Sequence, residues 1–168
     1  MKKTVAVIGS RGAIGNAVVD TLLADESVEA VFKFSRAEIT EHDDKVKHIF
    51  IDIEDEESIK QATESLPEDT KFDLIFVATG ILHDEKNVFP EKSIKDISFD
   101  KLIKVLTINT IGPTLVGKYF IPYLRKDSKS TFAFLSARVG SISDNKLGGW
   151  YSYRASKTAL NQIIRNFS

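Results

Sequence analysis

Tyr153 and Lys157 are the residues of this sequence whose types and spacing most directly suggest chemistry. They lie four residues apart in the stretch YSYRASK, at the start of a segment with a helical repeat of apolar residues. Residues four apart share a helix face, so the phenol and the ammonium would point the same way. Such a pair can donate a proton to a substrate, and it can equally be a solvated surface pair. The pair alone does not decide between these two interpretations.

A glycine-rich stretch near the N-terminus, GSRGAIG at residues 9–15, has the composition of a phosphate-binding loop. It follows a short β-branched run at residues 4–8 and precedes a helical repeat that begins at Ala13. Glycines allow a tight turn and a close approach of the backbone to a pyrophosphate, which the first N–H groups of the helix then bind. We therefore predict that a dinucleotide contacts Gly9, Ser10, Arg11, Gly12, Ile14 and Gly15.

The residues that follow the second predicted strand indicate the type of nucleotide. In dinucleotide-binding folds, a residue about 20 positions after the glycines contacts the adenosine ribose, and an acidic residue there selects NAD. This sequence has Ser35 and Arg36 in that region. An arginine can pair with the 2′-phosphate of NADP, and Arg11 would add a second positive charge. We predict NADP(H) in preference to NAD(H); the alternative is that both arginines are exposed and unpaired.

Two further segments are predicted to contact the cofactor. Asp52, followed by Ile53, ends the third predicted strand, where its carboxylate could accept a hydrogen bond from the adenine amino group. A helix N-cap is an equally good role for Asp52. The small residues Ala78, Thr79 and Gly80 follow the fourth strand and would let the cofactor pass close to the sheet; an ordinary turn would have the same composition.

Apolar runs and helical repeats alternate along the chain, which is typical of a parallel sheet covered by helices on both faces. Strands are expected at residues 4–8, 28–34, 46–51, 72–78 and 130–136. A long helix from residue 98 or 99 to about 124 should be loosened or kinked at Gly112-Pro113, because proline lacks a backbone donor. The predicted fold class is α/β, a doubly wound parallel sheet of the Rossmann type with about five strands. Residues 1–168 are expected to form a single NAD(P)-binding domain.

The C-terminal helical repeat is still in progress at Phe167 and Ser168, with neither a glycine cap nor a proline stop. A five-stranded open sheet that halts in a helix leaves the flank of its last strand without a neighbour. We therefore expect a chain that is shortened at its C-terminus; a naturally short protein is the alternative.

The composition argues against several classes of function. The chain has 23 basic and 24 acidic residues, so no excess of positive charge favours nucleic acid or an anionic membrane. It has no cysteine, and His42, His48 and His83 lack the spacing of metal ligands, so no metal site is predicted. The apolar run behind the N-terminal lysines is too short for a signal peptide or a membrane span. We expect a cytoplasmic protein.

Six short stretches together resemble the short-chain dehydrogenase/reductase family, and within it the branch of small carbonyl reductases that are similar to C-factor. They are GSRGAIG (9–15), IDI (51–53), ATGILH (78–83), IN (108–109), LSARVGS (135–141) and YRASK (153–157). The resemblance covers the whole chain, and its strength comes from six stretches in the right order. The family normally continues into two more strands and a segment that covers the substrate, and these are absent from this sequence.

The resemblance implies a role for three residues. Tyr153 would be the general acid in carbonyl reduction and the base in alcohol oxidation. Lowering a tyrosine pKa from near 10 to about 7 requires roughly 4 kcal/mol of phenolate stabilisation. Lys157 would supply much of this and would hold the nicotinamide ribose. Asn109 would hold a water that connects Lys157 to solvent; the alternative is a hydrogen-bonded polar residue at a kink of the long helix.

The active-site serine is the uncertain member of the set. The family usually has two serines at the end of the fifth strand, and the second polarises the substrate carbonyl. This chain has Ser136 followed by Ala137, so the expected hydroxyl is missing. Because side chains alternate across a strand, Ser136 could replace it only if the strand end twists or bulges. Ser141, in the following loop, is the second candidate.

These features favour an NADP(H)-dependent oxidoreductase that transfers hydride between the nicotinamide and a small carbonyl or alcohol substrate. The alternative is a nucleotide-binding module with little or no catalysis, because the serine is displaced and the covering segment is missing. The family resemblance also implies a homo-oligomer formed through the two long C-terminal helices. Substrate choice would depend on the loops at residues 81–95 and 141–150, where Trp150 and Tyr151 could line the pocket.

Overall fold

The computed structural model of the chain describes residues 2–37, 44–84 and 88–168, and His42 lies outside these ranges. One sheet contains five strands: β1 (Lys3–Ile8), β2 (Val28–Ser35), β3 (Val46–Phe50), β4 (Leu74–Val77) and β5 (Thr131–Phe134). Their order is β3-β2-β1-β4-β5, and every neighbouring pair is parallel. The predicted strands begin and end within two residues of the observed ones. The prediction of a five-stranded parallel sheet of the Rossmann type is confirmed.

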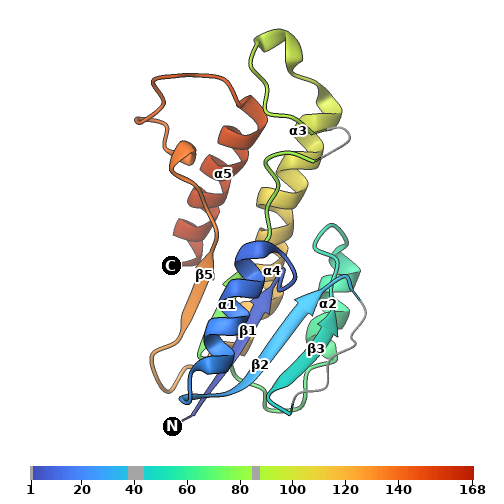
Figure 1. Cartoon of the computed structure of the whole chain (residues 1–168), viewed down its shortest axis with the longest axis vertical. Coiled ribbons are helices and arrows are strands. Elements are labelled where there is room, and N and C mark those ends of the chain that lie inside the picture. Colours follow the sequence, from blue (N-terminus) through green and yellow to red (C-terminus); the bar gives the residue numbers. More distant parts are fainter. Residues whose placement is uncertain (1, 38–43, 85–87) are drawn as a thin grey trace.

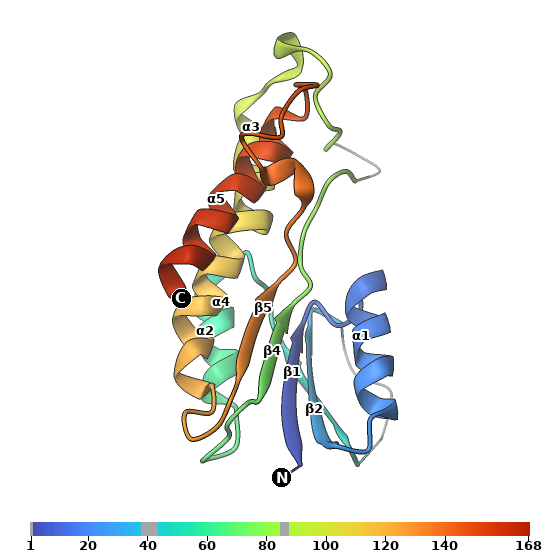
Figure 2. The ribbon, with the colours of Figure 1, turned by 90° about the vertical axis from the view of Figure 1, so that its left-hand side faces the viewer.

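Helices cover both faces of this sheet, as Figures 1 and 2 show. Helix α1 (Ala13–Ala24) lies on one face, and α2 (Glu56–Glu64), α4 (Gly112–Phe120) and α5 (Tyr151–Phe167) lie on the other. Helix α3 (Phe99–Leu106) extends beyond the carboxyl ends of the strands, beside the start of α5. The order of the strands reverses between β1 and β4, and open α/β sheets bind ligands at that point of their carboxyl edge.

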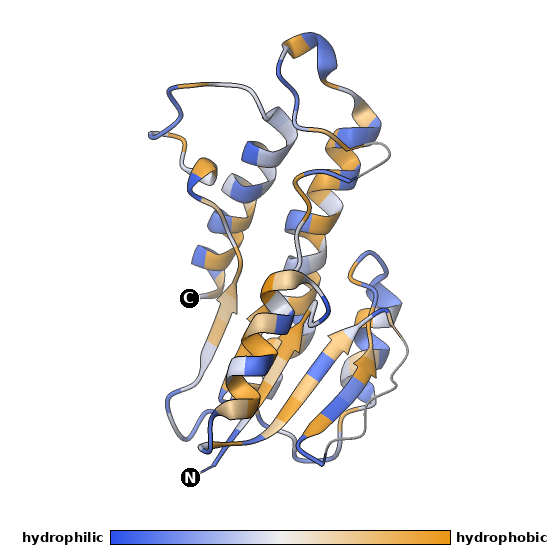
Figure 3. Ribbon diagram, viewed as in Figure 1, coloured by the Kyte–Doolittle hydropathy of each residue, from blue (hydrophilic) through white to orange (hydrophobic). Residues whose placement is uncertain are grey.

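Strand β1 shows how the sequence pattern builds the two layers of the core. Successive side chains of a strand point to opposite faces. Val5 and Val7 therefore pack with Val19 of α1. Ala6 and Ile8 belong to the larger cluster on the opposite face. Since β1 is buried on both faces, it is a continuous apolar run instead of an alternating one. In Figure 3 the strand β2 beside it is largely orange but also has blue, hydrophilic segments.

Aromatic side chains fix the second layer of helices on the sheet. Phe34 of β2 and Phe120 of α4 meet edge to face, with ring centroids 5.1 Å apart. Both side chains are fully buried, and burial of each phenylalanine contributes about 1.5 to 3 kcal/mol. This contact holds the C-terminal part of the long helix against the sheet, and so it also fixes the part that carries Asn109.

The long helix predicted from residue 98 or 99 is interrupted near the expected place. Ser98 caps α3, and a π-helical turn, Thr107–Ile111, joins α3 to α4. The N–H of Gly112 bonds to the carbonyl of Thr107, and Pro113 provides no donor, so the backbone ladder is widened just before the proline. The chain then ends this run in a 3₁₀ turn, Ile121–Tyr123.

Within the part of the chain that the structure describes, no helix is both long and apolar enough to cross a membrane.

Candidate active site

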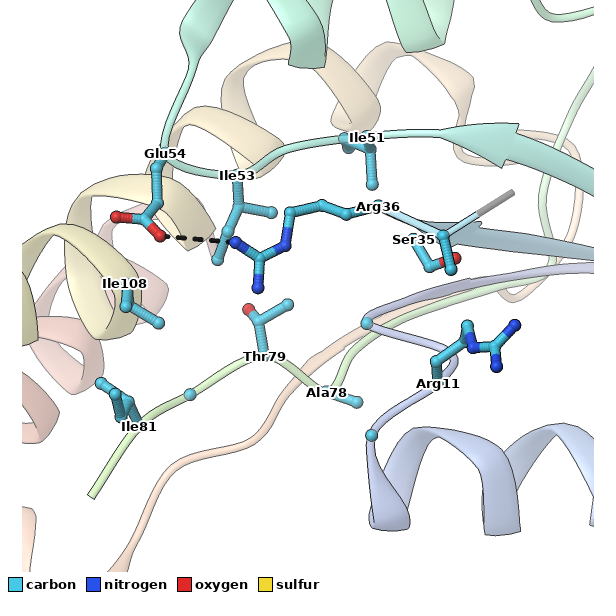
Figure 4. A pocket seen from close by; sticks show the side chains of 14 residues that line it. Arg11, Ser35, Arg36, Ile51, Ile53, Glu54, Ala78, Thr79, Ile81 and Ile108 are labelled. Carbon is cyan, nitrogen blue, oxygen red and sulfur yellow. Dashed lines mark ion pairs between the residues drawn. The ribbon is translucent and has the colours of Figure 1, made fainter. Parts of the chain in front are cut away.

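A cavity of about 460 Å³ opens at the carboxyl edge of the sheet. Figure 4 shows it from close by. Residues predicted to bind a cofactor supply much of its lining: Gly9, Arg11, Gly12, Ser35, Arg36, Ile53, Ala78, Thr79 and Gly80. Its lining also includes Ala37, Ile51, Glu54, Ile81 and Ile108, which were not predicted to contact the cofactor. Six predicted residues are not part of the lining: Ser10, Ile14, Gly15, Asp52, Tyr153 and Lys157.

The glycine loop is packed so closely that two of its positions admit no side chain. Gly9 has a φ of +82°, and a Cβ there would lie 2.8 Å from the methyl group of Thr79. A Cβ on Gly15 would overlap the carbonyl of Gly9. Among the described residues, no side chain caps α1, whose N-cap is Gly12. The first N–H groups of α1 are thus available to an anion, as a pyrophosphate site requires.

Ser10 supports the loop from behind. Its side chain is completely buried, and its hydroxyl donates a hydrogen bond to the carbonyl of Phe34 at 3.2 Å. The N–H groups of Gly9 and Ser10 bond to the same carbonyl. The hydroxyl of Ser10 therefore holds the loop against β2, and contact of Ser10 with a cofactor stays a prediction.

Arg36 is paired, contrary to the alternative that both arginines lack partners. Its guanidinium lies 3.8 Å from Oε1 of Glu54, and Nζ of Lys104 lies 2.6 Å from Oε2 of the same carboxylate. In Figure 4 the guanidinium of Arg36 points toward Glu54 across the cavity, whereas Arg11 extends the other way. The side chain of Arg36 is 68% exposed, so this pairing is weak and an anion can replace it.

Thr79 provides a direct test of whether a polar ligand fits this cavity. Its hydroxyl is buried, and it has no hydrogen-bond partner among the described residues. A buried hydroxyl without a partner has a desolvation cost of about 1 to 3 kcal/mol that no hydrogen bond offsets. Because Thr79 lines the cavity between the glycine loop and Gly80, a polar group of a bound dinucleotide would remove this cost. The lining thus fits a dinucleotide.

Asp52 does not cap the following helix. The N-cap of α2 is Asp55, whose side chain accepts a hydrogen bond from the N–H of Glu57 at 3.0 Å. The carboxylate of Asp52 instead accepts from the N–H of Glu54 at 3.0 Å. One of the two alternatives for Asp52 is therefore wrong, and contact with the adenine remains a prediction.

Gly80 connects the cavity to the predicted catalytic side chains. A Cβ at Gly80 would lie 3.2 Å from Nζ of Lys157 and 3.3 Å from Oδ1 of Asn109. Lys157 is 2% exposed, and its Nζ donates a hydrogen bond to the carbonyl of Leu135 at 2.9 Å. Burial lowers the pKa of Lys157 to about 8. The ammonium therefore lies beside Gly80, which lines the cavity, and near the carboxyl ends of β4 and β5.

Asn109 is a hydrogen-bonded residue at the kink of the long helix, and the water that the family resemblance assigns to it stays a prediction. Its Oδ1 accepts from the N–H of Ile81 at 2.7 Å, and its Nδ2 donates to the carbonyl of Ile81 at 2.9 Å and to Oγ of Ser156 at 3.0 Å. Its side chain is completely buried. Asn109 thus joins the segment after β4 to helix α5, which holds Lys157 in place.

Tyr153 lies one turn before Lys157 on α5, with its ring centroid 5.8 Å from Nζ. The two residues are brought together as their spacing predicts. Burial raises the pKa of Tyr153 above its ordinary value of 10. This direction is opposite to the expected lowering, because burial of the phenol disfavours the charged phenolate. A lowered pKa would need further groups near the phenol.

The serines at the end of β5 are engaged elsewhere. β5 ends at Phe134, so Ser136 lies in the segment after the strand, and its hydroxyl donates to Oδ1 of Asn161 at 2.6 Å. The hydroxyl of Ser141 lies 3.3 Å from that of Ser143. Neither bond involves Tyr153. The indole of Trp150 does approach it, with ring centroids 6.3 Å apart.

The chain belongs to the short chain dehydrogenase family, whose family model matches residues 3–168. Fold, glycine loop and the Tyr153–Lys157 pair agree with this membership. The predicted family is therefore confirmed, and with it the predicted class of enzyme, an oxidoreductase acting on CH–OH or C=O groups, is supported.

Individual relatives lie in the same family. C-signal of Myxococcus xanthus is 36% identical over 76 residues, which are 45% of this chain and 46% of that protein. The 1-hydroxy-2-glutathionyl-2-methyl-3-butene dehydrogenase of Rhodococcus sp. (strain AD45) is 29% identical over 98% of this chain and 69% of its own length. The NADPH-bound carbonyl reductase from chicken fatty liver is 27% identical, with a TM-score of 0.83 over 98% of this chain and 69% of that one. A short-chain dehydrogenase/reductase from Burkholderia multivorans with bound NADP is 25% identical, with a TM-score of 0.84 over 99% of this chain and 72% of that one. C-signal and a carbonyl reductase, two of these relatives, are thus similar to this chain, as the predicted branch of the family implies.

Proposed function

We propose that this chain is the NADP(H)-binding domain of an oxidoreductase that transfers hydride between the nicotinamide and a small carbonyl or alcohol. The observation that carries the proposal is the position of Gly80, which lines the cavity and adjoins both Lys157 and Asn109. It makes the predicted dinucleotide site and the predicted catalytic side chains parts of one site. Residues 1–168 would form a single domain, because one sheet organises all the described elements.

The preference for NADP(H) rests on Arg36 at the end of β2, with no acidic residue in its place. Two related structures are described with bound NADP or NADPH, which supports the same choice. The nicotinamide would supply the hydride, and the residues of the cavity would hold the cofactor through Arg36, the glycine loop and Thr79.

In the proposed reduction, Tyr153 gives the proton of its hydroxyl to the carbonyl oxygen of the substrate. Lys157 favours this transfer because its ammonium, 5.8 Å from the ring centroid, stabilises the phenolate that forms. Asn109 holds the segment of Ile81 and helix α5 at fixed distance. Alcohol oxidation uses the same groups in reverse, with Tyr153 as the base.

Replacing Tyr153 by Phe tests this role. Carbonyl reduction should be abolished while NADPH affinity stays nearly unchanged, because the hydroxyl is removed and the packing is kept. NADPH consumption with a panel of aldehydes and ketones measures the activity, and fluorescence titration measures the affinity. Tyr119→Phe is the matched control, because the hydroxyl of Tyr119 bonds to Glu56 outside the cavity, and this variant should keep full activity. Equal activity of the Tyr153 and Tyr119 variants would remove Tyr153 from the mechanism.

Replacing Arg36 by Ala tests the preference for NADP(H). Loss of a charge-assisted contact should weaken NADPH binding by about 1.5 to 3 kcal/mol, which is about 10- to 150-fold, and should leave NADH binding nearly unchanged. Arg138→Ala is the control, since Arg138 is an exposed arginine paired with Asp144 outside the cavity. An unchanged ratio of the two affinities would refute the role given to Arg36.

The second candidate is a nucleotide-binding module with little or no catalysis. The hydroxyl of Ser136 is bonded to Asn161, and Ala137 has no hydroxyl to polarise a carbonyl. Wild-type chain that binds NADPH and consumes none with any carbonyl compound would favour this candidate.

The proposal extends to the setting of the protein. We propose a cytoplasmic location, where NADPH would be available as a reductant. Self-association through the long helix and α5 is supported by the exposed apolar side chains of Phe99, Ile103 and Ile111 on the α3–α4 run. Light scattering of the purified chain measures the mass directly.

A further inference from the structure

The first turn of α5, which carries Tyr153, is held by an unusual backbone. Gly148 and Gly149 both have a φ of +66°, and Trp150, the N-cap residue, has a φ of +53°. A bulky residue such as tryptophan rarely adopts this left-handed conformation. The side chain of Trp150 makes no capping hydrogen bond. The helix therefore begins without help from its own N-cap side chain, and other groups must hold its start.

Glu91 accepts hydrogen bonds from the start of α5, where the side chain of the N-cap residue accepts none. Its backbone carbonyl accepts a hydrogen bond from the N–H of Trp150 at 2.6 Å. Its carboxylate accepts from the N–H of Ser152 at 3.2 Å and from the hydroxyl of Ser152. Glu91 and Ser152 are separated by 61 residues in the sequence. Three hydrogen bonds thus fasten the loop after β4 to the first turn of α5.

Because Glu91 is buried, its carboxylate depends on these hydrogen bonds. Glu91 and Ser152 are each 2% exposed. A carboxylate removed from water is costly unless donors surround it. The N-terminus of a helix offers both N–H donors and a partial positive charge, and so it compensates the buried charge. If α5 began elsewhere, burial of this carboxylate would not be compensated.

Tyr153 follows Ser152 directly, so the position of Ser152 constrains the position of the phenol. Glu91, Ser152 and Tyr153 also line one small recess together with Val88 and Val105. A shift of the first turn of α5 would move the hydroxyl of Tyr153, whereas Lys157, one turn further on, is held separately by Leu135. The bonds of Glu91 therefore act on Tyr153 more than on Lys157.

We propose that Glu91 is a positioning residue, which acts through Ser152 to fix the first turn of α5 and hence the hydroxyl of Tyr153. The proposal rests on the proposed function in so far as that hydroxyl takes part in carbonyl reduction. Glu91 also belongs to the loop at residues 81–95, so it joins the predicted substrate loop to the helix that carries the acid.

The experiment compares Glu91→Ala, Glu91→Gln and Ser152→Ala with the wild-type chain. Asp96→Ala is the matched control, because the carboxylate of Asp96 also caps a short turn of the same loop, through the N–H groups of Lys92 and Ser93, without contacting α5. Three quantities are measured: kcat and KM for carbonyl reduction, NADPH affinity by fluorescence titration, and amide hydrogen exchange in the first turn of α5.

In Glu91→Ala, kcat should fall about 10- to 100-fold, since a small displacement of an acid catalyst has effects of this size. NADPH affinity should change less than about 2-fold, because the cavity lining is untouched. Glu91→Gln should recover much of the activity, as its amide oxygen can still accept from Ser152. Exchange at Ser152 and Tyr153 should accelerate in Glu91→Ala and stay at the wild-type rate in Asp96→Ala.

Wild-type exchange rates in both Glu91→Ala and Ser152→Ala would overturn the inferred fastening, whatever the activity. Faster exchange with an unchanged kcat would overturn the positioning role. If Glu91→Ala does not fold, Ser152→Ala carries the test, because it keeps the backbone bond and removes only a hydroxyl. A wild-type chain that binds NADPH and reduces no carbonyl would refute the proposed function. The exchange rates alone would then test whether Glu91 holds the first turn of α5.

Discussion

Lys157 should destabilise the fold that it serves, and this can be measured. The side chain is 2% exposed, and burial lowers its pKa from the ordinary value of 10.5 to about 8. Lys157→Met keeps the length and the apolar stem and removes the charge. The variant should therefore lose carbonyl reduction while it loses the cost of burying an ammonium.

The size and sign of this effect follow from the pKa. Below pH 8 both folded and unfolded chains carry the proton, and the folded chain bears the full cost of about 3 kcal/mol. Between pH 8 and 10.5 the unfolded chain binds more protons, so the free energy of unfolding rises with pH. Between pH 7 and pH 9.5 the gain is about 2 kcal/mol. Above 10.5 neither state is charged and the contribution is gone.

Urea unfolding at pH 7, 8, 8.7 and 9.5 measures this gain in the wild-type chain and in Lys157→Met. The series stops at pH 9.5 because the pKa of Tyr153 is raised, so above pH 10 the unfolded chain loses that proton first and stability falls. Up to pH 9.5 the phenol of Tyr153 keeps its proton in the folded chain, so the difference between the two chains reports on Lys157. At pH 7 alone the comparison is less decisive, since the variant also leaves the carbonyl of Leu135 without its donor. Equal pH slopes in the two chains would refute the buried-ammonium argument.

Two further predictions concern the cofactor cavity. Glu54→Gln should increase the affinity for NADPH about 2- to 5-fold and leave the affinity for NADH unchanged, because it removes the anion that competes for Arg36. The control, Glu56→Gln, lies outside the cavity and should change neither affinity. Equal effects of the two substitutions would contradict the competition. Gly9→Ala should weaken the binding of both nucleotides and lower the free energy of unfolding by about 1 to 2 kcal/mol, since the residue has a φ of +82° and the added methyl group would press on Thr79. A urea unfolding midpoint equal to that of the wild-type chain would instead show that the loop can accommodate a side chain.

The sequence predicts the fold well because the fold depends on local patterns. The buried β1 strand is a run of apolar residues between a lysine pair and Gly9, and the helix repeat starts just after the glycines, so both elements can be found without tertiary information. The long helix is predicted with its interruption, because Pro113 removes a donor wherever it lies. The separation of four residues likewise places Tyr153 and Lys157 on one face of the helix.

What the sequence misses depends on contacts between distant segments. Glu54 lies two positions after a predicted cofactor residue, but only the structure shows its carboxylate between Arg36 and Lys104. Glu91 lies in a polar loop with no helical or strand pattern, and its bond to Ser152 spans 61 residues. The expected lowering of the Tyr153 pKa fails for a related reason, since spacing shows that a cation is near and says nothing of how deeply the phenol is buried.

Four energetically costly groups among the described residues lie near one another. The buried ammonium of Lys157, the left-handed Trp150, the buried carboxylate of Glu91 and the unpartnered hydroxyl of Thr79 all lie at the carboxyl edge of the sheet or on the loops above it. The two faces of the sheet are instead packed with apolar side chains. If stability alone determined these residues, apolar replacements would be favoured at the edge as well. Their concentration where parallel strands end is what a site for chemistry requires, because a catalytic group must be desolvated and held in place against its own preference for water.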